Sequence, residues 1–147
     1  MSTKIELKIV TPERLILQEI VDQVSLPTTN GEITILPGHI PLISGLASGD
    51  IVAMTDGEYV PMAVSGGFVE VKKDGEKTLV AILADFAEHV GNITDEEIEK
   101  AKAKAEELRK LAQDKGVVDY EHFAAELERS LNRVKIADKW KSKKYRK

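Results

Sequence analysis

The first 86 residues carry short runs in which apolar and polar side chains alternate. In the first run, Ile5, Leu7 and Ile9 alternate with charged residues. Successive side chains of a strand point to opposite faces, so this run predicts a strand with one buried and one exposed face. Similar runs predict strands over residues 4–10, 14–18, 20–26, 32–35, 50–55, 58–64, 67–72 and 77–83.

Turn-forming dipeptides separate several of these predicted strands. Asn30-Gly31, Asp56-Gly57 and Asp74-Gly75 can each supply the two residues of positive φ that a type I′ hairpin requires, so we expect antiparallel pairing. One flat sheet of so many strands would leave a face uncovered, which favours a small β-sandwich or flattened barrel. The pair Gly66-Gly67 predicts a bulge or a close approach between two strands.

The hydrophobic period changes after residue 92. Thr94 and Glu97 have the spacing of a capping box, which predicts the start of a helix. Gly116 is expected to end this helix, and Asp119 to begin a second one that continues toward Trp140. The short link predicts an antiparallel helical hairpin. The predicted fold class is therefore α+β, with an antiparallel β-sandwich at residues 1–88 and the hairpin at residues 93–147. Apolar positions at helical spacing in the first helix are Ile98, Ala101, Ala105, Leu108 and Leu111.

Alanine supplies much of the uncharged surface of the predicted hairpin. A buried Leu side chain contributes about 1.5–3 kcal/mol, and an Ala contributes well under that. Two interpretations stay open: the hairpin is held weakly and can detach, or the alanines simply allow its two helices to pack closely.

Residues 26–42 combine turn-forming residues with apolar ones. Three prolines and Gly38 make the backbone change direction repeatedly. The apolar residues of this segment must be covered by the core or by another protein. They are Ile33, Ile35, Leu36, Ile40 and Leu42.

Composition narrows the possible functions. The chain has no cysteine, which excludes disulfides and thiolate metal sites. It has no run of 18 apolar residues, so we expect neither a membrane-spanning helix nor a secretion signal. From Arg129 to Lys147, nine Lys or Arg residues accompany a single acidic residue. Such a basic end is either solvated or meets nucleic acid, anionic lipid or an acidic protein surface.

Recognisable catalytic motifs are absent. The sequence contains no Gly-x-x-x-x-Gly-Lys, Gly-x-Ser-x-Gly or His-Glu-x-x-His. His39, His89 and His122 do not have the spacing of metal ligands. We therefore expect neither an enzyme nor a metal protein.

Several segments of the chain occur in a recognisable order: residues 7–14, 24–46, 65–71 and 118–120 with 125–127. Their order and spacing resemble those of the epsilon subunit of bacterial F-type ATP synthases, and the resemblance covers essentially the whole chain. It implies a non-catalytic rotor subunit in the central stalk of a proton-translocating ATP synthase, located peripherally at the cytoplasmic face of the cell membrane, with the sandwich beside the gamma subunit and above the c-subunit ring.

The resemblance also implies roles for individual residues. Glu32 matches the position that meets the polar loops of the c ring, and His39 matches a turn near gamma and the ring; we infer that these partners cover Ile40 and Leu42. In this family the helices fold against the sandwich or extend along gamma toward the alpha and beta subunits, where they inhibit ATP hydrolysis. Basic residues expected to meet an acidic segment of beta are Arg129, Arg133, Lys135 and Lys139.

Some members of the family bind ATP as a regulatory ligand through an Ile-Asp-x-x-Arg-Ala motif. Here Glu99 replaces the Asp and Lys102 replaces the Arg. Lysine lacks the planar fork that grips phosphate with two hydrogen bonds, so we expect any ATP binding to be weak. Positions at which ATP-binding members carry arginine are occupied by Arg109, Arg129 and Arg133.

A second interpretation does not involve ATP synthase. The chain could be a free-standing β-sandwich binding module whose basic helix contacts nucleic acid or anionic lipid. The basic end contains Trp140 and Tyr145 but no groove-reading motif, which favours the rotor subunit and argues against a nucleic-acid partner.

Overall fold

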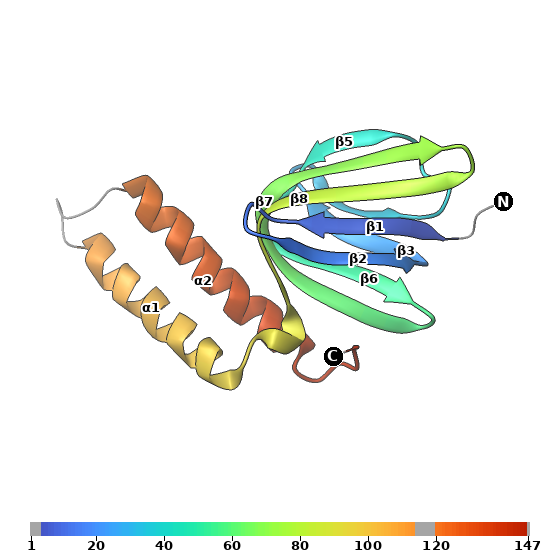
Figure 1. Cartoon of the computed structure of the whole chain (residues 1–147). Helices are drawn as coiled ribbons and strands as arrows, with labels where there is room; N and C mark the ends of the chain where they lie inside the picture. Colours follow the sequence, from blue (N-terminus) through green and yellow to red (C-terminus); the bar gives the residue numbers. More distant parts are fainter. Residues whose placement is uncertain (1–3, 114–119, 147) are drawn as a thin grey trace.

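The computed structural model describes residues 4–113 and 120–146, and side chains within these ranges except those of residues 112–113 and 120–123. The predicted fold class is confirmed: a β-sandwich is followed by two helices (Figure 1). The predictions for Gly116 and Asp119 lie outside the described residues. The elements are β1 (Ile5–Val10), β2 (Leu15–Val21), β3 (Gln23–Thr28), β4 (Gly31–Ile35), β5 (Leu42–Gly45), β6 (Gly49–Thr55), β7 (Glu58–Asp74), β8 (Lys77–His89), the 3₁₀ turn η1 (Val90–Asn92), α1 (Asp95–Gln113) and α2 (Tyr120–Trp140).

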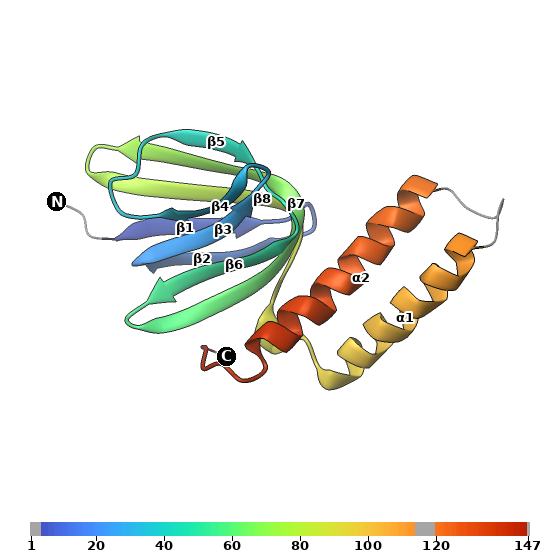
Figure 2. The same ribbon diagram turned by 180° about the vertical axis from the view of Figure 1, so that it is seen from behind.

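The strands form one continuous sheet in the order β2-β1-β8-β7-β6-β3-β4, and β5 pairs with β7 beside β6. The two views show this sheet folded over on itself, with β1, β2 and β8 on one side and β3, β4 and β6 on the other (Figures 1 and 2). All described ladders are antiparallel except that between β1 and β8, which is parallel. The turn-forming dipeptides in the sequence could not predict this parallel ladder, because its two strands are far apart in the sequence.

Alternating side chains of the strands fill the space between the two layers. Ile5, Leu7 and Ile9 are at most 1% exposed, as their alternation predicts, while Glu6 and Lys8 face solvent. Ile35 and Ile82 reach the same core from β4 and β8 and are fully buried. This core is apolar and continuous, so the sandwich has the internal packing of an independent unit.

The hairpin turns differ in detail from the prediction. Asp56 and Gly57 have φ values of 50° and 81°, which fits the predicted type I′ turn. The other two turn predictions were wrong by one residue, because Thr28 pairs with Gly31 and Asp74 pairs with Lys77. At the first of these turns the Thr28 hydroxyl accepts a hydrogen bond from the Asn30 amide at 3.2 Å, so a threonine side chain, not a positive-φ pair, stabilises the reversal.

Strand β7 spans two of the predicted strands without interruption. Its first half pairs with β6 and its second half with β5, and Gly66-Gly67 lie between the halves. Gly67 has φ 119°, and a Cβ atom there would lie 2.1 Å from the Leu83 carbonyl oxygen of β8. The predicted close approach of two strands is therefore confirmed. Strand β5, which follows Pro41, was missed from the sequence, and β8 continues to His89, beyond the predicted end at residue 83.

The helical hairpin begins with the predicted capping box. The Glu97 amide donates to the Thr94 hydroxyl at 3.1 Å, and the Thr94 amide donates to the Glu97 carboxylate at 3.0 Å. Ala101, Ala105 and Leu108 of α1 are buried, as their spacing predicts. Helix α2 lies between α1 and the sandwich (Figures 1 and 2), so most contacts between the hairpin and the β-strands are made by α2.

Candidate subunit-contact surfaces and the docked hairpin

The loop between β4 and β5 is fixed in shape but exposes apolar side chains. The Gly38 amide donates to the hydroxyl of the buried Thr78 at 2.7 Å, and the His39 amide donates to the Leu36 carbonyl at 3.0 Å. These bonds fix the turn, yet Leu36 is 52% exposed and Ile40 is 69% exposed. An ordered loop that holds large apolar side chains in solvent has the properties of a protein-contact site.

The other predicted contact residues divide into two groups. Glu32 is exposed on β4, and His39 is half-buried with its Nδ1 atom 2.7 Å from the Ile40 carbonyl oxygen. Leu42, by contrast, is partly buried and packs against the sandwich core, as does Ile33. The sandwich itself therefore provides part of the cover that Leu42 needs, whereas Ile40 lacks such cover among the described residues.

A second exposed apolar surface crosses four strands and was not predicted. Phe68 of β7 pairs with Leu83 of β8, Leu83 pairs with Val10 of β1, and Val10 pairs with Leu15 of β2. Phe68, Leu83 and Leu15 are 61%, 58% and 50% exposed. We call this row of four residues the outer apolar row. Its signal in the sequence was the run Leu15-Ile16-Leu17, in which the alternation breaks down and apolar residues occupy both faces.

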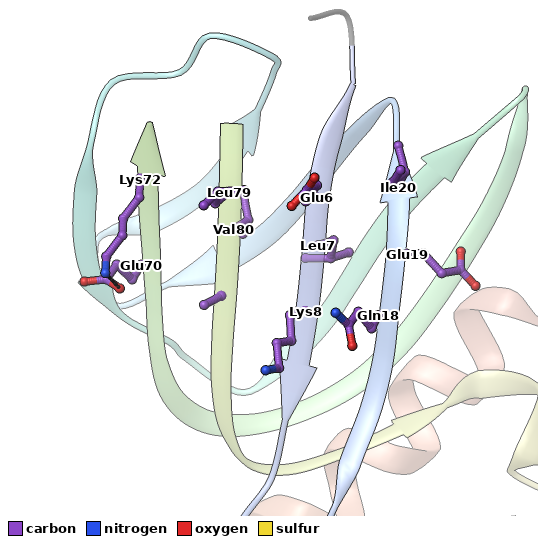
Figure 3. A pocket seen from close by; sticks show the side chains of 11 residues that line it. Glu6, Leu7, Lys8, Gln18, Glu19, Ile20, Glu70, Lys72, Leu79 and Val80 are labelled. Atoms are coloured by element: carbon purple, nitrogen blue, oxygen red, sulfur yellow. Dashed lines mark ion pairs between the residues drawn. The ribbon is translucent and has the colours of Figure 1, made fainter. Parts of the chain in front are cut away.

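A hollow of about 600 Å³ lies beside the outer apolar row. Figure 3 shows its side chains on β1, β2, β7 and β8. Ile20 is 61% exposed at one side, and Lys72 pairs with Glu70 at 3.3 Å at the other. Glu6 and Lys8 of β1 lie between these two sides, so the hollow mixes apolar and charged groups, as many protein interfaces do. Residues that line the hollow include Glu6, Lys8, Gln18, Leu79 and Ala81.

Polar contacts hold the middle of α2 on the sandwich. Arg133 donates from Nε and Nη2 to the two carboxylate oxygens of Glu88, at 2.6 and 3.3 Å, and the side chains are 23% and 15% exposed. Asn132 donates to the Val64 carbonyl at 3.1 Å. A bidentate, partly desolvated pair of this kind fixes orientation as well as contributing energy. The position of α2 on the sandwich is therefore specific.

The end of α2 is anchored by the single tryptophan of the chain. Trp140 is 3% exposed and belongs to an apolar cluster with Ala63, Val90, Ile93 and Ile136. Its indole Nε1 donates to the Asp50 carboxylate at 2.9 Å. This cluster is separate from the sandwich core. The hairpin is therefore attached by a small interface of its own, a feature that the alanine content of the helices did not reveal.

The residues predicted to bind ATP do not all converge. Glu99 and Lys102 line a hollow of about 350 Å³ between α1, η1 and the end of α2, together with Asp95, Asp138 and Lys141. Arg109 is exposed and pairs with Glu106, Arg133 binds Glu88, and the Arg129 guanidinium lies 5.0 Å from the centre of the Phe86 ring. In the docked hairpin these arginines do not line the hollow that contains Glu99 and Lys102.

The residues predicted to meet the beta subunit are also partly occupied. Arg133 binds Glu88, and Lys139 binds Asp50 at 2.9 Å. Lys135 is exposed on α2.

None of the helices in the described ranges has the length and apolar character needed to cross a membrane.

Comparison with known proteins shows the family. Residues 4–90 match the family model described as the beta-sandwich domain of the ATP synthase delta/epsilon chain. The ATP synthase epsilon chain of Nitratidesulfovibrio vulgaris (strain DP4) is 40% identical over 136 residues, covering 92% of this chain and 97% of that one. The ATP synthase epsilon chain of Syntrophobacter fumaroxidans is 38% identical over 139 residues, covering 95% and 99%.

A solved structure has the same fold. It is a chain in the mitochondrial ATP synthase of Euglena gracilis, with a TM-score of 0.66 and 24% identity over 97% of this chain and 82% of that chain.

A β-sandwich with a docked two-helix hairpin and large exposed apolar side chains is typical of a subunit of a larger assembly. The chain belongs to the family of ATP synthase delta/epsilon chains. Its role as an epsilon-type rotor subunit in the central stalk of the F-type ATP synthase, predicted from the sequence, is confirmed. The free-standing binding module is not favoured.

Proposed function

We propose that this chain is a non-catalytic subunit that couples proton flow to ATP synthesis, and that its hairpin inhibits ATP hydrolysis after leaving the sandwich. The observation that carries the proposal is the separation of the two apolar clusters. Because Ile5, Leu7 and the other core residues pack without any helix residue, the hairpin can undock while the sandwich stays folded and bound.

The charged contacts of the docked hairpin are suited to exchange of partners. Undocking separates Arg133 from Glu88 and Lys139 from Asp50, and an acidic segment of the beta subunit would then replace the lost carboxylates. Arg129 and Lys135 would add to the same basic surface. Because a partly buried charge is costly when left unpaired, this exchange lowers the free-energy difference between the docked and the inhibitory state.

We assign the gamma and c-ring contacts to the two exposed apolar surfaces. The outer apolar row with its neighbouring hollow provides a broad surface for gamma. The loop carrying Ile40, together with Glu32 and His39, provides a narrow one for the polar loops of the c ring. These contacts hold the chain peripherally at the cytoplasmic face of the membrane, and the alpha and beta subunits are reached through the hairpin.

A regulatory nucleotide site stays a separate proposal. Glu99 and Lys102 share a hollow with Lys141. The ammonium groups of Lys102 and Lys141 could both bind phosphate there. Asp95 and Asp138 also line that hollow and oppose an anion. ATP is therefore proposed as a weak ligand here.

A version that ends at Asn92 tests the inhibitory role of the hairpin. Added to a catalytic head depleted of its own epsilon chain, the full chain is expected to lower the rate of ATP hydrolysis, and the shortened chain is expected to leave it unchanged. Both forms are expected to co-elute with gamma, since the sandwich core is complete without the helices. Equal inhibition by the two forms would place the brake in the sandwich and contradict the proposal.

Ile40→Asp tests the loop as a rotor contact. Burying an Ile side chain contributes about 1.5–3 kcal/mol, so the variant is expected to bind membranes containing the c ring and gamma about 10- to 100-fold more weakly. Binding is measured by titration and sedimentation with membranes stripped of their own epsilon chain. Leu131→Asp is the control, because Leu131 is also an exposed apolar residue, at 40%, but lies on α2. Equal affinities of the two variants would remove Ile40 from the contact.

A further inference from the structure

The chain beyond α2 turns back under the sandwich instead of continuing away from it. In both views the C-terminal end lies beneath the β-strands, near η1 (Figures 1 and 2). The Arg146 amide donates to the Tyr59 carbonyl of β7 at 2.8 Å, and the Arg146 guanidinium binds the Glu19 carboxylate of β2. We call residues 141–146 the C-terminal latch.

Aromatic contacts connect the latch to α2 and to the linker. The Trp140 ring contacts both Tyr59 and Tyr145, with ring centres 5.8 and 6.0 Å away and edge-to-face geometry. Tyr145 also contacts His89, at 6.0 Å between ring centres. Such pairs stabilise a fold beyond the effect of the apolar area they bury. The latch thus adds contacts at one end of a hairpin that otherwise has a small interface.

His89 joins the latch to the linker between the sandwich and the hairpin. Its Nδ1 atom accepts a hydrogen bond from the Gly91 amide at 2.8 Å and caps η1. The ring also lies beside the backbone of Arg146. An imidazole that accepts at Nδ1 must be neutral at that nitrogen, because both nitrogens of the protonated ring carry hydrogen.

We propose that the C-terminal latch holds the helical hairpin on the sandwich, and that proton uptake by His89 releases it. Protonation replaces the acceptor at Nδ1 by a donor that faces the Gly91 amide, so the cap of η1 is lost. It also places a positive charge beside the Arg146 guanidinium. Both effects act at the point where the linker and the latch meet.

The groups around His89 determine the direction of the pH effect. Burial lowers the pKa of His89 below its ordinary value of 6.5; the nearby Arg146 backbone and the Glu19 carboxylate oppose this, and the Arg146 guanidinium reinforces it. Tyr145 is the other titratable group in contact with the ring. The docked state therefore binds fewer protons than the undocked state, so docking is stable above pH 6.5 and weakens as the pH falls below it.

The fluorescence of Trp140 provides the test, because it is the single tryptophan of the chain. Acrylamide quenching of the full chain is measured from pH 8 to pH 5. We expect low accessibility at pH 8 and at least a two-fold rise in the quenching constant, with a midpoint below pH 6.5. His89→Asn is expected to remove this rise, because the Asn oxygen can still accept from the Gly91 amide but does not titrate. His39→Asn and His122→Asn are expected to retain it.

A matched pair of variants tests the latch itself at pH 8. Arg146→Ala and Lys144→Ala remove the same charge from the same segment, but Arg146 contacts β2 and β7 whereas Lys144 is exposed. We expect Arg146→Ala to raise the quenching constant and Lys144→Ala to leave it unchanged. Equal quenching in this pair would overturn the latch. A pH-dependent rise that persists in His89→Asn, or Trp140 remaining inaccessible at pH 5, would overturn the role of His89. These measurements use the isolated chain, so their outcome does not depend on whether the hairpin inhibits hydrolysis.

Discussion

Gly67→Ala is expected to prevent the sandwich from folding stably, with a loss exceeding about 4 kcal/mol in the free energy of unfolding. A Cβ atom at this position would lie 2.1 Å from the Leu83 carbonyl oxygen and 2.8 Å from the Ala84 Cα atom, both in the backbone of β8. Backbone atoms cannot rotate away, so β7 and β8 would have to separate where they join the two halves of the sheet. Denaturant unfolding followed by circular dichroism measures the effect.

Gly31→Ala separates this steric effect from backbone strain. Gly31 has φ 113°, close to the 119° of Gly67, but an added Cβ atom would have no neighbour within 4 Å. This control is expected to lose about 1–3 kcal/mol, the cost of holding a non-glycine residue at such a φ. Comparable losses in the two variants would show that strain, not strand contact, explains the glycine at position 67.

Trp140→Ala is expected to shift the hairpin from docked to undocked. Trp140 is the largest side chain of the interface cluster, and the variant also leaves the partly buried Asp50 carboxylate without its indole donor. Removing a buried Trp costs about 3–5 kcal/mol, which corresponds to a change of about 100-fold or more in the docking equilibrium. The sandwich core does not include Trp140, so the strands are expected to remain folded.

Spin labels at introduced cysteines measure this shift directly, because the chain has no cysteine of its own. Lys73 on β7 and Lys110 on α1 are exposed and suitable for labelling. One narrow distance distribution is expected for the parent chain, and a broader one at longer distance for Trp140→Ala. Leu131→Ala removes a 40%-exposed apolar side chain from the same helix and is expected to resemble the parent. An unchanged distribution in Trp140→Ala would mean that the polar contacts are sufficient for docking.

Local patterns predicted most of the strands and both helices. The alternation of Ile5, Leu7 and Ile9 and the capping box of Thr94 and Glu97 depend on residues within one element, and both features are present as predicted. Strand β5 was missed because it has only four residues and begins directly after Pro41. Its position is determined by pairing with β7, and such pairing leaves little trace in the local sequence.

The docking contacts could not be predicted because their partners are distant in the sequence. Arg133 and Glu88 are 45 positions apart, and Trp140 and Asp50 are 90 apart. In the sequence, the basic residues of α2 therefore indicated only a partner of opposite charge. The structure shows that carboxylates of the chain itself bind some of these basic residues. This part of the basic surface is therefore occupied in the docked state and becomes available only after undocking. The candidate contacts of Glu32 and Ile40 stay predictions, since no partner chain bears on them.

The parallel ladder between β1 and β8 has a consequence for the order of events during synthesis. Strand β1 lies between β2 and β8, so the first hairpin to leave the ribosome lacks one neighbour until residues 77–89 have emerged. Closing the sandwich must wait for this distant segment, and such long-range pairing is slow. The helices emerge later still and find the surface of β6 and β7 already formed. Translation therefore delivers the helical hairpin last, onto strands that have already folded, and a chain interrupted before α2 still contains every strand of the sandwich.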